Sequence, residues 1–124
     1  MITEVYDIET FPNLFTYTGY CLQSKEYKQF IIHYSKNQIN DLYSWLTQKD
    51  FIQVGYNNKG FDYPIIHYLL INYKKLSKMQ PIDVAEVLYN KAQEIISSEQ
   101  PMGIRPKDEI IPQVDLFAMW HYNN

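Results

Sequence analysis

The order of strand-like and helical segments constrains the fold of this chain more than any other feature. Three strand-like segments come first, over residues 2–9, 14–22 and 26–34. The connections between them are short and polar, as is typical of connections between antiparallel neighbours. The chain is therefore predicted to begin as an antiparallel meander of three strands.

Helical and strand-like segments alternate after the meander. Apolar residues at helical spacing predict three helices, over residues 36–48, 63–76 and 83–98. Ser35 is available as the N-cap of the first helix. Two further strands are predicted: a compact, buried central strand at 51–56 and a last strand at 113–117. The order predicts an α/β fold with a mixed five-stranded sheet, in which helix, strand, helix, helix and strand follow the meander.

The composition is that of one ordinary globular domain, and we expect a single domain over residues 1–124. Of the 124 residues, 46% are hydrophobic and 20% are charged, and the formal net charge is −3. This charge gives no long-range positive field that would attract a nucleic acid. If a nucleic acid binds, metal ions or another polypeptide must offset the repulsion.

Cysteine content and hydropathy predict a cytoplasmic protein with no membrane partner. Cys21 is the only cysteine, which excludes an internal disulfide and a cysteine-based metal site and fits a reducing compartment. No apolar stretch reaches the roughly 18 residues that a membrane span needs. The N-terminus also lacks the basic and apolar regions of a secretory signal.

Two carboxylates stand one residue apart in the first strand-like segment. Side chains at positions i and i+2 of a strand leave the same face, so Asp7 and Glu9 are predicted to project together. Two anions held side by side are costly unless a cation lies between them, and a hard divalent metal ion is the simplest such cation. Taken alone, such a pair is also typical of a solvated strand end.

A second group of polar residues lies where the central strand ends and the next helix begins. Gly55-Tyr56-Asn57 is followed there by Phe61-Asp62, and ligand sites in open α/β sheets gather at the carboxyl ends of strands. Asp62 is predicted at or beside the helix N-terminus, where free N–H groups favour an anion. It could act as an N-cap or as part of a site, but capping does not require the upstream Asn-x-x-x-Phe-Asp spacing.

Together, Asp7-Ile8-Glu9 and the segment from Gly55 to Asp62 resemble the first two motifs of a known family. This family is the proofreading 3′–5′ exonuclease domain of family B DNA polymerases, particularly the phage-type branch. The domain belongs to the four-carboxylate exonuclease superfamily and has a ribonuclease H-like fold. Val114-Asp115-Leu116 resembles the strand that precedes the third motif, so the resemblance runs from Val5 to Leu116.

The resemblance implies a set of site residues, a cofactor and a substrate. Asp7, Glu9 and Asp62 would be the catalytic carboxylates and would hold two divalent metal ions, Mg²⁺ or Mn²⁺. The implied reaction is phosphodiester hydrolysis at the single-stranded 3′ end of DNA. Asn57 would hydrogen-bond near the terminal nucleotide or steady the motif, and Phe61 would pack against a base or in the core.

The third motif of the family, Tyr-x-x-x-Asp on a helix after the last strand, is missing. The sequence stops at Asn124, which leaves no room for that helix, so we expect a C-terminally incomplete domain with weak or no activity alone. Asp115 could replace the missing carboxylate, although its neighbours match a structural strand. We also expect an exposed apolar sheet face, covered by the remainder of a polymerase or by a second copy of the chain.

Two other functions stay open. The first is a non-catalytic accessory module that keeps the exonuclease-like fold, and the second is a ribonuclease H-like enzyme that acts on RNA. Four tyrosines could stack on nucleic-acid bases or form half-buried strand faces; they are Tyr17, Tyr20, Tyr27 and Tyr34. The histidines show no spacing for a shared metal ion, and we expect structural roles for them; they are His33, His67 and His121.

Overall fold

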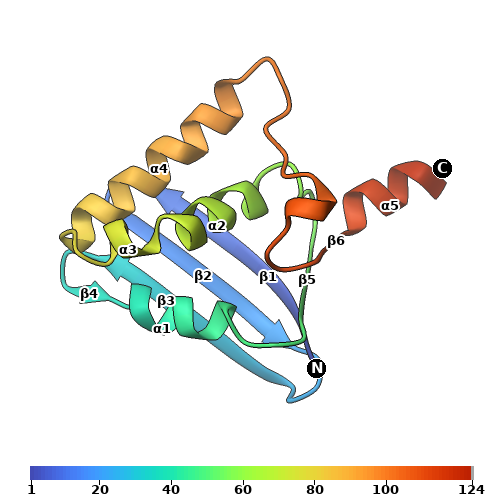
Figure 1. Ribbon diagram of the computed structural model, residues 1–124, viewed down its shortest axis with the longest axis horizontal. Helices are drawn as coiled ribbons and strands as arrows, with labels where there is room; N and C mark the ends of the chain where they lie inside the picture. The colour runs from blue at the N-terminus through green and yellow to red at the C-terminus, as the bar shows by residue number, and fades with distance from the viewer. Residues whose placement is uncertain (124) are drawn as a thin grey trace.

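The computed structural model describes the backbone of residues 1–123 and the side chains of residues 1–119. The fold is mixed α/β, with a six-stranded sheet in the order β4-β3-β2-β1-β5-β6 (Figure 1). The strands are β1 (Ile2–Phe11), β2 (Leu14–Cys21), β3 (Glu26–His33), β4 (Lys36–Asn37), β5 (Phe51–Gly55) and β6 (Gln113–Asp115). The helices are α1 (Ile39–Leu46), α2 (Asp62–Ile71), α3 (Tyr73–Leu76), α4 (Pro81–Ser97) and α5 (Leu116–Asn123), with a short 3₁₀ helix at Pro106–Asp108.

The sheet has an antiparallel half and a parallel half. β1, β2, β3 and β4 pair as antiparallel neighbours, which confirms the predicted meander. β5 pairs in parallel with both β1 and β6, and β5 and β6 end side by side, at Gly55 and Asp115. β5 pairs with β1 only as far as Val5, and the rest of β1 runs on past the end of β5.

The sheet has six strands instead of the predicted five, because the segment predicted to start the first helix forms β4. β4 extends the meander by two residues, and α1 begins only at Ile39. Ser35 is therefore not the N-cap; its hydroxyl lies against the His33 ring instead. The N-cap residue is Gln38, and the side chain of Asn37 accepts a hydrogen bond from the Ile39 amide at 3.2 Å.

Two other element boundaries differ from the prediction. The predicted helix over residues 63–76 is divided at Asn72, whose side-chain amide donates to the Tyr68 carbonyl at 2.9 Å and so competes with the helical ladder. The last strand ends at Asp115, and α5 begins at the next residue. The expectation that the sequence leaves no room for a helix after the last strand was therefore wrong, although α5 lacks the Tyr-x-x-x-Asp motif and carries no acidic residue.

One face of the sheet is buried along β1, β2, β5 and β6, whereas in β3 only Ile32 is buried. In β1, Glu4, Tyr6 and Ile8 point into the core, whereas Val5 and Asp7 point out. The same alternation runs through β2, β5 and β6. Figure 1 shows α1 to α4 on one side of the sheet, and α5 extending away beyond the β6 edge. Among the described residues, no helix covers the other face, which is called the open face below.

α2 is the central helix of the covered face. Nearly all its residues are buried, including Ile65, Ile66 and Leu69, and it lies against α4. A helix that is apolar all round belongs in a core, because it has no face suited to water. Burial of α2 fixes the position of its first residue, Asp62, at the sheet. In the described part of the chain, no helix is long and apolar enough to cross a membrane.

Candidate functional site

Asp62 lies against β1, just past the point where β5 ends. The Ile8 amide donates to Asp62 Oδ2 at 3.3 Å. Because β5 pairs with β1 only through Val5, the Ile8 amide faces no strand partner on that side, and the carboxylate takes its place. Asp62 is the first residue of α2, the N-cap position falls on Phe61, and no side chain caps the helix. Asp62 therefore does not act as the N-cap.

The carboxyl of Asp62 is buried and sits beside other anions. It is 8% exposed. Burial is the largest cause, and together with the charges of Asp7 and Asp115 it raises the pKa of Asp62 from its ordinary 3.8 to about 6. The hydrogen bond from the Ile8 amide opposes this change. The fold thus holds Asp62 in an environment that disfavours its charge unless a cation is present.

Asp7 and Glu9 leave the same face of β1, as predicted. Both are exposed on the open face and flank Ile8, whose amide contacts Asp62. In the part of the chain that the structure describes, ion pairs are limited to Lys91–Glu94 and Arg105–Asp108. Among the described residues, therefore, none of the three carboxylates has a cationic side-chain partner; they are Asp7, Glu9 and Asp62.

Asp7 lies near enough for its charge to raise the pKa of Asp62, and the charge of Asp115 acts on Asp62 in the same way. The described residues do not complete a three-ligand site. Among the described residues, no three His, Cys, Asp or Glu side chains are grouped so that they could hold a metal ion. The oxygen donors of the pair suit a hard divalent ion such as Mg²⁺ or Mn²⁺. Glu9 as a further ligand stays a prediction.

The turn between β5 and α2 has a defined backbone conformation. Asn57 adopts a φ of 57°, in the left-handed region that Asn tolerates better than most residues. Its carbonyl accepts hydrogen bonds from the Gly60 and Phe61 amides at 3.2 and 3.1 Å. Asn57 is exposed, and Phe61 packs partly buried against the core. Contacts of Asn57 and Phe61 with a nucleic acid stay predictions.

Asp115 ties this turn to α5. Its Oδ1 accepts hydrogen bonds from the Asn57 amide at 2.8 Å and from the Phe117 and Ala118 amides at 3.0 and 3.4 Å. Its Oδ2 accepts from the Lys59 amide at 3.1 Å. Asp115 thus caps α5 and anchors the turn, which is a structural role that the sequence analysis missed. An Asp between a strand and a helical segment is the signal that could have revealed this cap.

A series of buried, hydrogen-bonded polar side chains, called the buried polar chain below, supports the turn between β5 and α2. Asn58 is fully buried, and its amide donates to Gln113 Oε1 at 2.9 Å. Tyr6 donates its hydroxyl to the same oxygen at 2.8 Å, and Gln113 donates to Gln53 Oε1 at 2.6 Å. These bonds hold the turn that precedes Asp62 against β1, β5 and β6.

The polar chain continues under the helices to Glu4. Gln53 donates to the Tyr17 hydroxyl at 2.8 Å, Tyr17 donates to Glu4, and the Trp45 indole donates to the other Glu4 oxygen at 2.9 Å. Burial raises the pKa of Glu4, while these hydrogen bonds oppose the change. Polar residues at strand positions in phase with the core were the available sequence signal; they are Glu4, Gln53 and Gln113.

The histidines with described side chains make local contacts. His33 lies against Ser35, and His67 shares a hydrogen bond of 3.1 Å with the Tyr63 hydroxyl. Tyr63 in turn accepts from the Ile110 amide at 2.8 Å, which fixes the loop before β6 to α2. The side chain of His121 lies outside the described residues.

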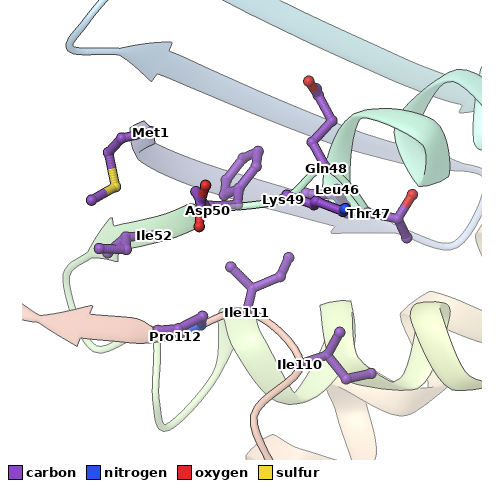
Figure 2. A pocket seen from close by; sticks show the side chains of 11 residues that line it. Met1, Leu46, Thr47, Gln48, Lys49, Asp50, Ile52, Ile110, Ile111 and Pro112 are labelled. Carbon is purple, nitrogen blue, oxygen red and sulfur yellow. The ribbon is translucent and has the colours of Figure 1, made fainter.

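A cavity of about 510 Å³ lies at the opposite end of β5 from Asp62 (Figure 2). Its walls include Met1, Leu46, Ile52 and Ile111, and Asp50 is its only acidic lining residue. None of the predicted site residues lines this cavity. The predicted site residues therefore lie away from this cavity, toward the other end of β5.

Comparisons of the chain with protein-family models, with curated proteins and with solved structures found no match. The class of protein is therefore defined by the fold and the site alone. It is a mixed α/β domain whose six-stranded sheet carries a carboxylate pair, Asp7 and Asp62, where β1 runs past the end of β5.

Proposed function

We propose that this chain is a 3′–5′ exonuclease-like domain that hydrolyses phosphodiester bonds at a single-stranded DNA 3′ end. The observation that carries the proposal is the position of Asp62, buried against the Ile8 amide and within the field of Asp7. A fold that places two carboxylates in one environment without a cationic side chain leaves a place for an external cation. The resemblance to the exonuclease domain of family B DNA polymerases, with its ribonuclease H-like fold, supports the same function.

The chain would contribute carboxylates at defined positions. Asp7 and Asp62 would hold a divalent ion, Mg²⁺ or Mn²⁺, and Glu9 would join them from the same face of β1 to complete a two-ion site. Such ions supply charge neutralisation at phosphorus and a more acidic water molecule. The hydrogen bond from Ile8 holds Asp62 in place, and the exposed Asn57 side chain would hydrogen-bond near the terminal nucleotide.

Asp115 is a weaker choice for a fourth metal ligand. Both of its oxygens accept hydrogen bonds from backbone amides. A metal ion would have to displace bonds that anchor the turn and α5. We therefore propose that the chain alone is weakly active and that full activity needs another polypeptide, either the remainder of a polymerase or a second copy.

A second candidate function is a non-catalytic accessory module with the same fold. It is favoured by the finding that no three potential metal-ligand side chains are grouped among the described residues. Such a module would use the fold for interaction and would not cleave nucleic acid. Cleavage of RNA in preference to DNA would instead indicate a ribonuclease H-like enzyme.

A nuclease assay with matched variants tests the proposal. Single-stranded DNA and RNA of the same sequence, each labelled at the 5′ end, would be incubated with the chain and Mn²⁺. We expect stepwise shortening of the DNA from its 3′ end, which is lost in Asp7→Ala and Asp62→Asn. Asp41→Ala is the control, because Asp41 is an exposed acid in the first turn of α1.

The two alternatives give different results in the same assay. Binding of Mn²⁺ without shortening would contradict the enzyme as an independent unit and would support the need for a partner polypeptide. Neither binding nor shortening would favour the accessory module. Shortening that survives in Asp7→Ala would contradict the assigned site.

A further inference from the structure

A groove of about 480 Å³ lies on the open face of the sheet and includes Asp7 in its wall. Its other lining residues include Val5, Thr18, Tyr20 and Tyr27, from β1, β2 and β3. The groove therefore begins at a proposed catalytic carboxylate and runs across the antiparallel half of the sheet. It is a different place from the cavity in Figure 2, which none of these residues lines.

The strand register divides the groove into an apolar row and a polar row. Val5 pairs with Tyr20, which pairs with Tyr27. Two residues along, Asp7 pairs with Thr18, which pairs with Gln29. In the polar row the Gln29 amide donates to the Thr18 hydroxyl at 3.2 Å. Because the rows are two residues apart on each strand, they lie side by side on the open face.

The apolar row exposes an aromatic ring to solvent. The Tyr27 side chain is 77% exposed, and its ring centroid lies 4.8 Å from that of Tyr20 with the rings inclined at 53°. Tyr20 supports one part of the Tyr27 ring, and the remainder faces water. An exposed aromatic ring beside a groove can stack on a nucleobase with little dependence on its sequence.

The negative charge of Asp7 favours a nucleotide over a protein surface as the occupant of the groove. A protein surface that covered the groove would bury Asp7, which has no cationic side-chain partner among the described residues, and burying an unpaired charge is costly. A nucleotide that arrives with divalent ions avoids this cost, because the ions would lie between Asp7 and a phosphate. Its base would then reach toward the aromatic row.

We propose that this groove is the subsite for the base of the terminal nucleotide, which stacks on Tyr27 while its phosphate group lies at Asp7. The proposal rests on the function proposed above and names the position of its substrate. Thr18 lines the groove between phosphate and base, and Thr18 and the neighbouring Gln29 would offer hydrogen bonds to the sugar. Tyr27 is a binding residue in this arrangement and takes no part in the chemical step.

The test uses a thymidine oligonucleotide that carries 2-aminopurine at its 3′ end, with Ca²⁺ in place of Mn²⁺ so that binding is measured apart from cleavage. Stacking quenches the fluorescence of this base. We expect Tyr27→Ala to lose the quenching and to raise the Kd on the order of ten-fold. Tyr27→Phe keeps the ring and should behave like the unmodified chain.

Tyr34→Ala is the matched control, because Tyr34 is 79% exposed and lies outside the groove. It should leave quenching and Kd unchanged. In the Mn²⁺ nuclease assay, Tyr27→Ala should raise the KM and leave the kcat near that of the unmodified chain. A higher KM with an unchanged kcat would not result from a general loss of folded protein, because such a loss lowers the apparent kcat.

Failure of the subsite and failure of the proposed function are distinguishable. If the unmodified chain shortens DNA and Tyr27→Ala binds the oligonucleotide equally well, the subsite is wrong and the nuclease function stands. If the unmodified chain neither binds nor shortens DNA, both are wrong. If Tyr27→Ala converts a dimer into a monomer and leaves the Kd for DNA unchanged, the groove is an interface between copies, and the subsite is wrong.

Discussion

Asp62 is a carboxylic acid in an environment that disfavours its charged form. Its carboxyl is buried beside Asp7, which raises its pKa to about 6. In the unfolded chain the same group titrates near 3.8. Between these two values the folded state binds more protons than the unfolded state, so the stability contributed by this group falls as pH rises.

We therefore predict that the free energy of unfolding, measured in EDTA, falls between about pH 4 and pH 6. A difference of about two pKa units corresponds to at most about 3 kcal/mol. Asp62→Asn should remove this component and make the chain more stable than the unmodified protein at pH 7. Urea titrations at several pH values measure both effects. A profile that Asp62→Asn leaves unaltered would contradict the assigned environment.

Gly19 is a residue at which the buried polar chain excludes any side chain. A Cβ at this position would lie 2.2 Å from the carboxyl carbon of Glu4, which the Tyr17 and Trp45 hydrogen bonds hold in place. We predict that Gly19→Ala lowers the free energy of unfolding by about 1–3 kcal/mol, the usual cost of overpacking.

Gly103→Ala is the control for that substitution. A Cβ at Gly103 would lie 3.2 Å from the Lys59 carbonyl, in an exposed loop that can adjust. Thermal unfolding should show a smaller change than for Gly19→Ala. Equal effects of the two substitutions would show that Glu4 is not held where the structure places it.

At the scale of elements, Asp115 couples the β5–α2 turn to α5. Asp115→Ala should leave the Asn57, Lys59, Phe117 and Ala118 amides without their acceptor. We predict a loss of about 2 kcal/mol, the upper range for a helix cap. Hydrogen exchange of the Asn57 and Lys59 amides should become faster.

Asp115→Asn tests the roles of the two carboxylate oxygens separately. Asn keeps one oxygen for the Asn57 and Phe117 amides but places an NH₂ group against the Lys59 amide. Exchange should therefore accelerate mainly at Lys59. If Asp115→Ala leaves exchange unchanged in both the turn and α5, the coupling between these elements is contradicted.

The main elements of this fold could be predicted from sequence because their local patterns agree with their packing. Strand-like segments with short polar connections at β1 and β2, and the compact apolar run at β5, predict strands that the structure contains. β4 could not be predicted, since Lys36–Asn37 is polar, exposed and only two residues long. β4 forms because β3 has a free edge with which it can pair. Its cause is therefore a tertiary contact and not a local sequence pattern.

The candidate site, like the fold, could be predicted from local patterns only in part. The common face of Asp7 and Glu9 follows from strand geometry alone, and the structure has both side chains exposed on that face. The contact of Asp62 with the Ile8 amide depends on β5 pairing with β1 only as far as Val5, which no local pattern encodes. The roles of Asp115 and Asn58 likewise depend on which strand lies beside β5.

At the scale of the whole molecule, the sheet has one covered face and one open face (Figure 1). The proposed site lies beside β1, just past the carboxyl ends of β5 and β6. A divalent ion bound by Asp7 and Asp62 would stabilise the folded state, because the unfolded chain does not hold these carboxylates together. At an ion concentration one hundred times the Kd, the gain is about 2.7 kcal/mol.

We accordingly predict that Mn²⁺ raises the Tm at pH 7.5, and that this increase shrinks as pH falls through about 6, where Asp62 takes up a proton. Differential scanning calorimetry of the unmodified chain, Asp62→Asn and the Asp41→Ala control measures this. An equal increase in the unmodified chain and in Asp62→Asn would mean that the ion binds elsewhere.

The central claim is that Asp7 and Asp62 share a divalent cation beside the Ile8 amide. Anomalous scattering from a crystal soaked in Mn²⁺ tests this claim most directly, because it locates the ion itself. We predict an anomalous peak between the two carboxylates, absent in Asp7→Ala crystals. A well-diffracting Mn²⁺-soaked crystal with no peak at this position, or with its peak only at other carboxylates, would contradict the account.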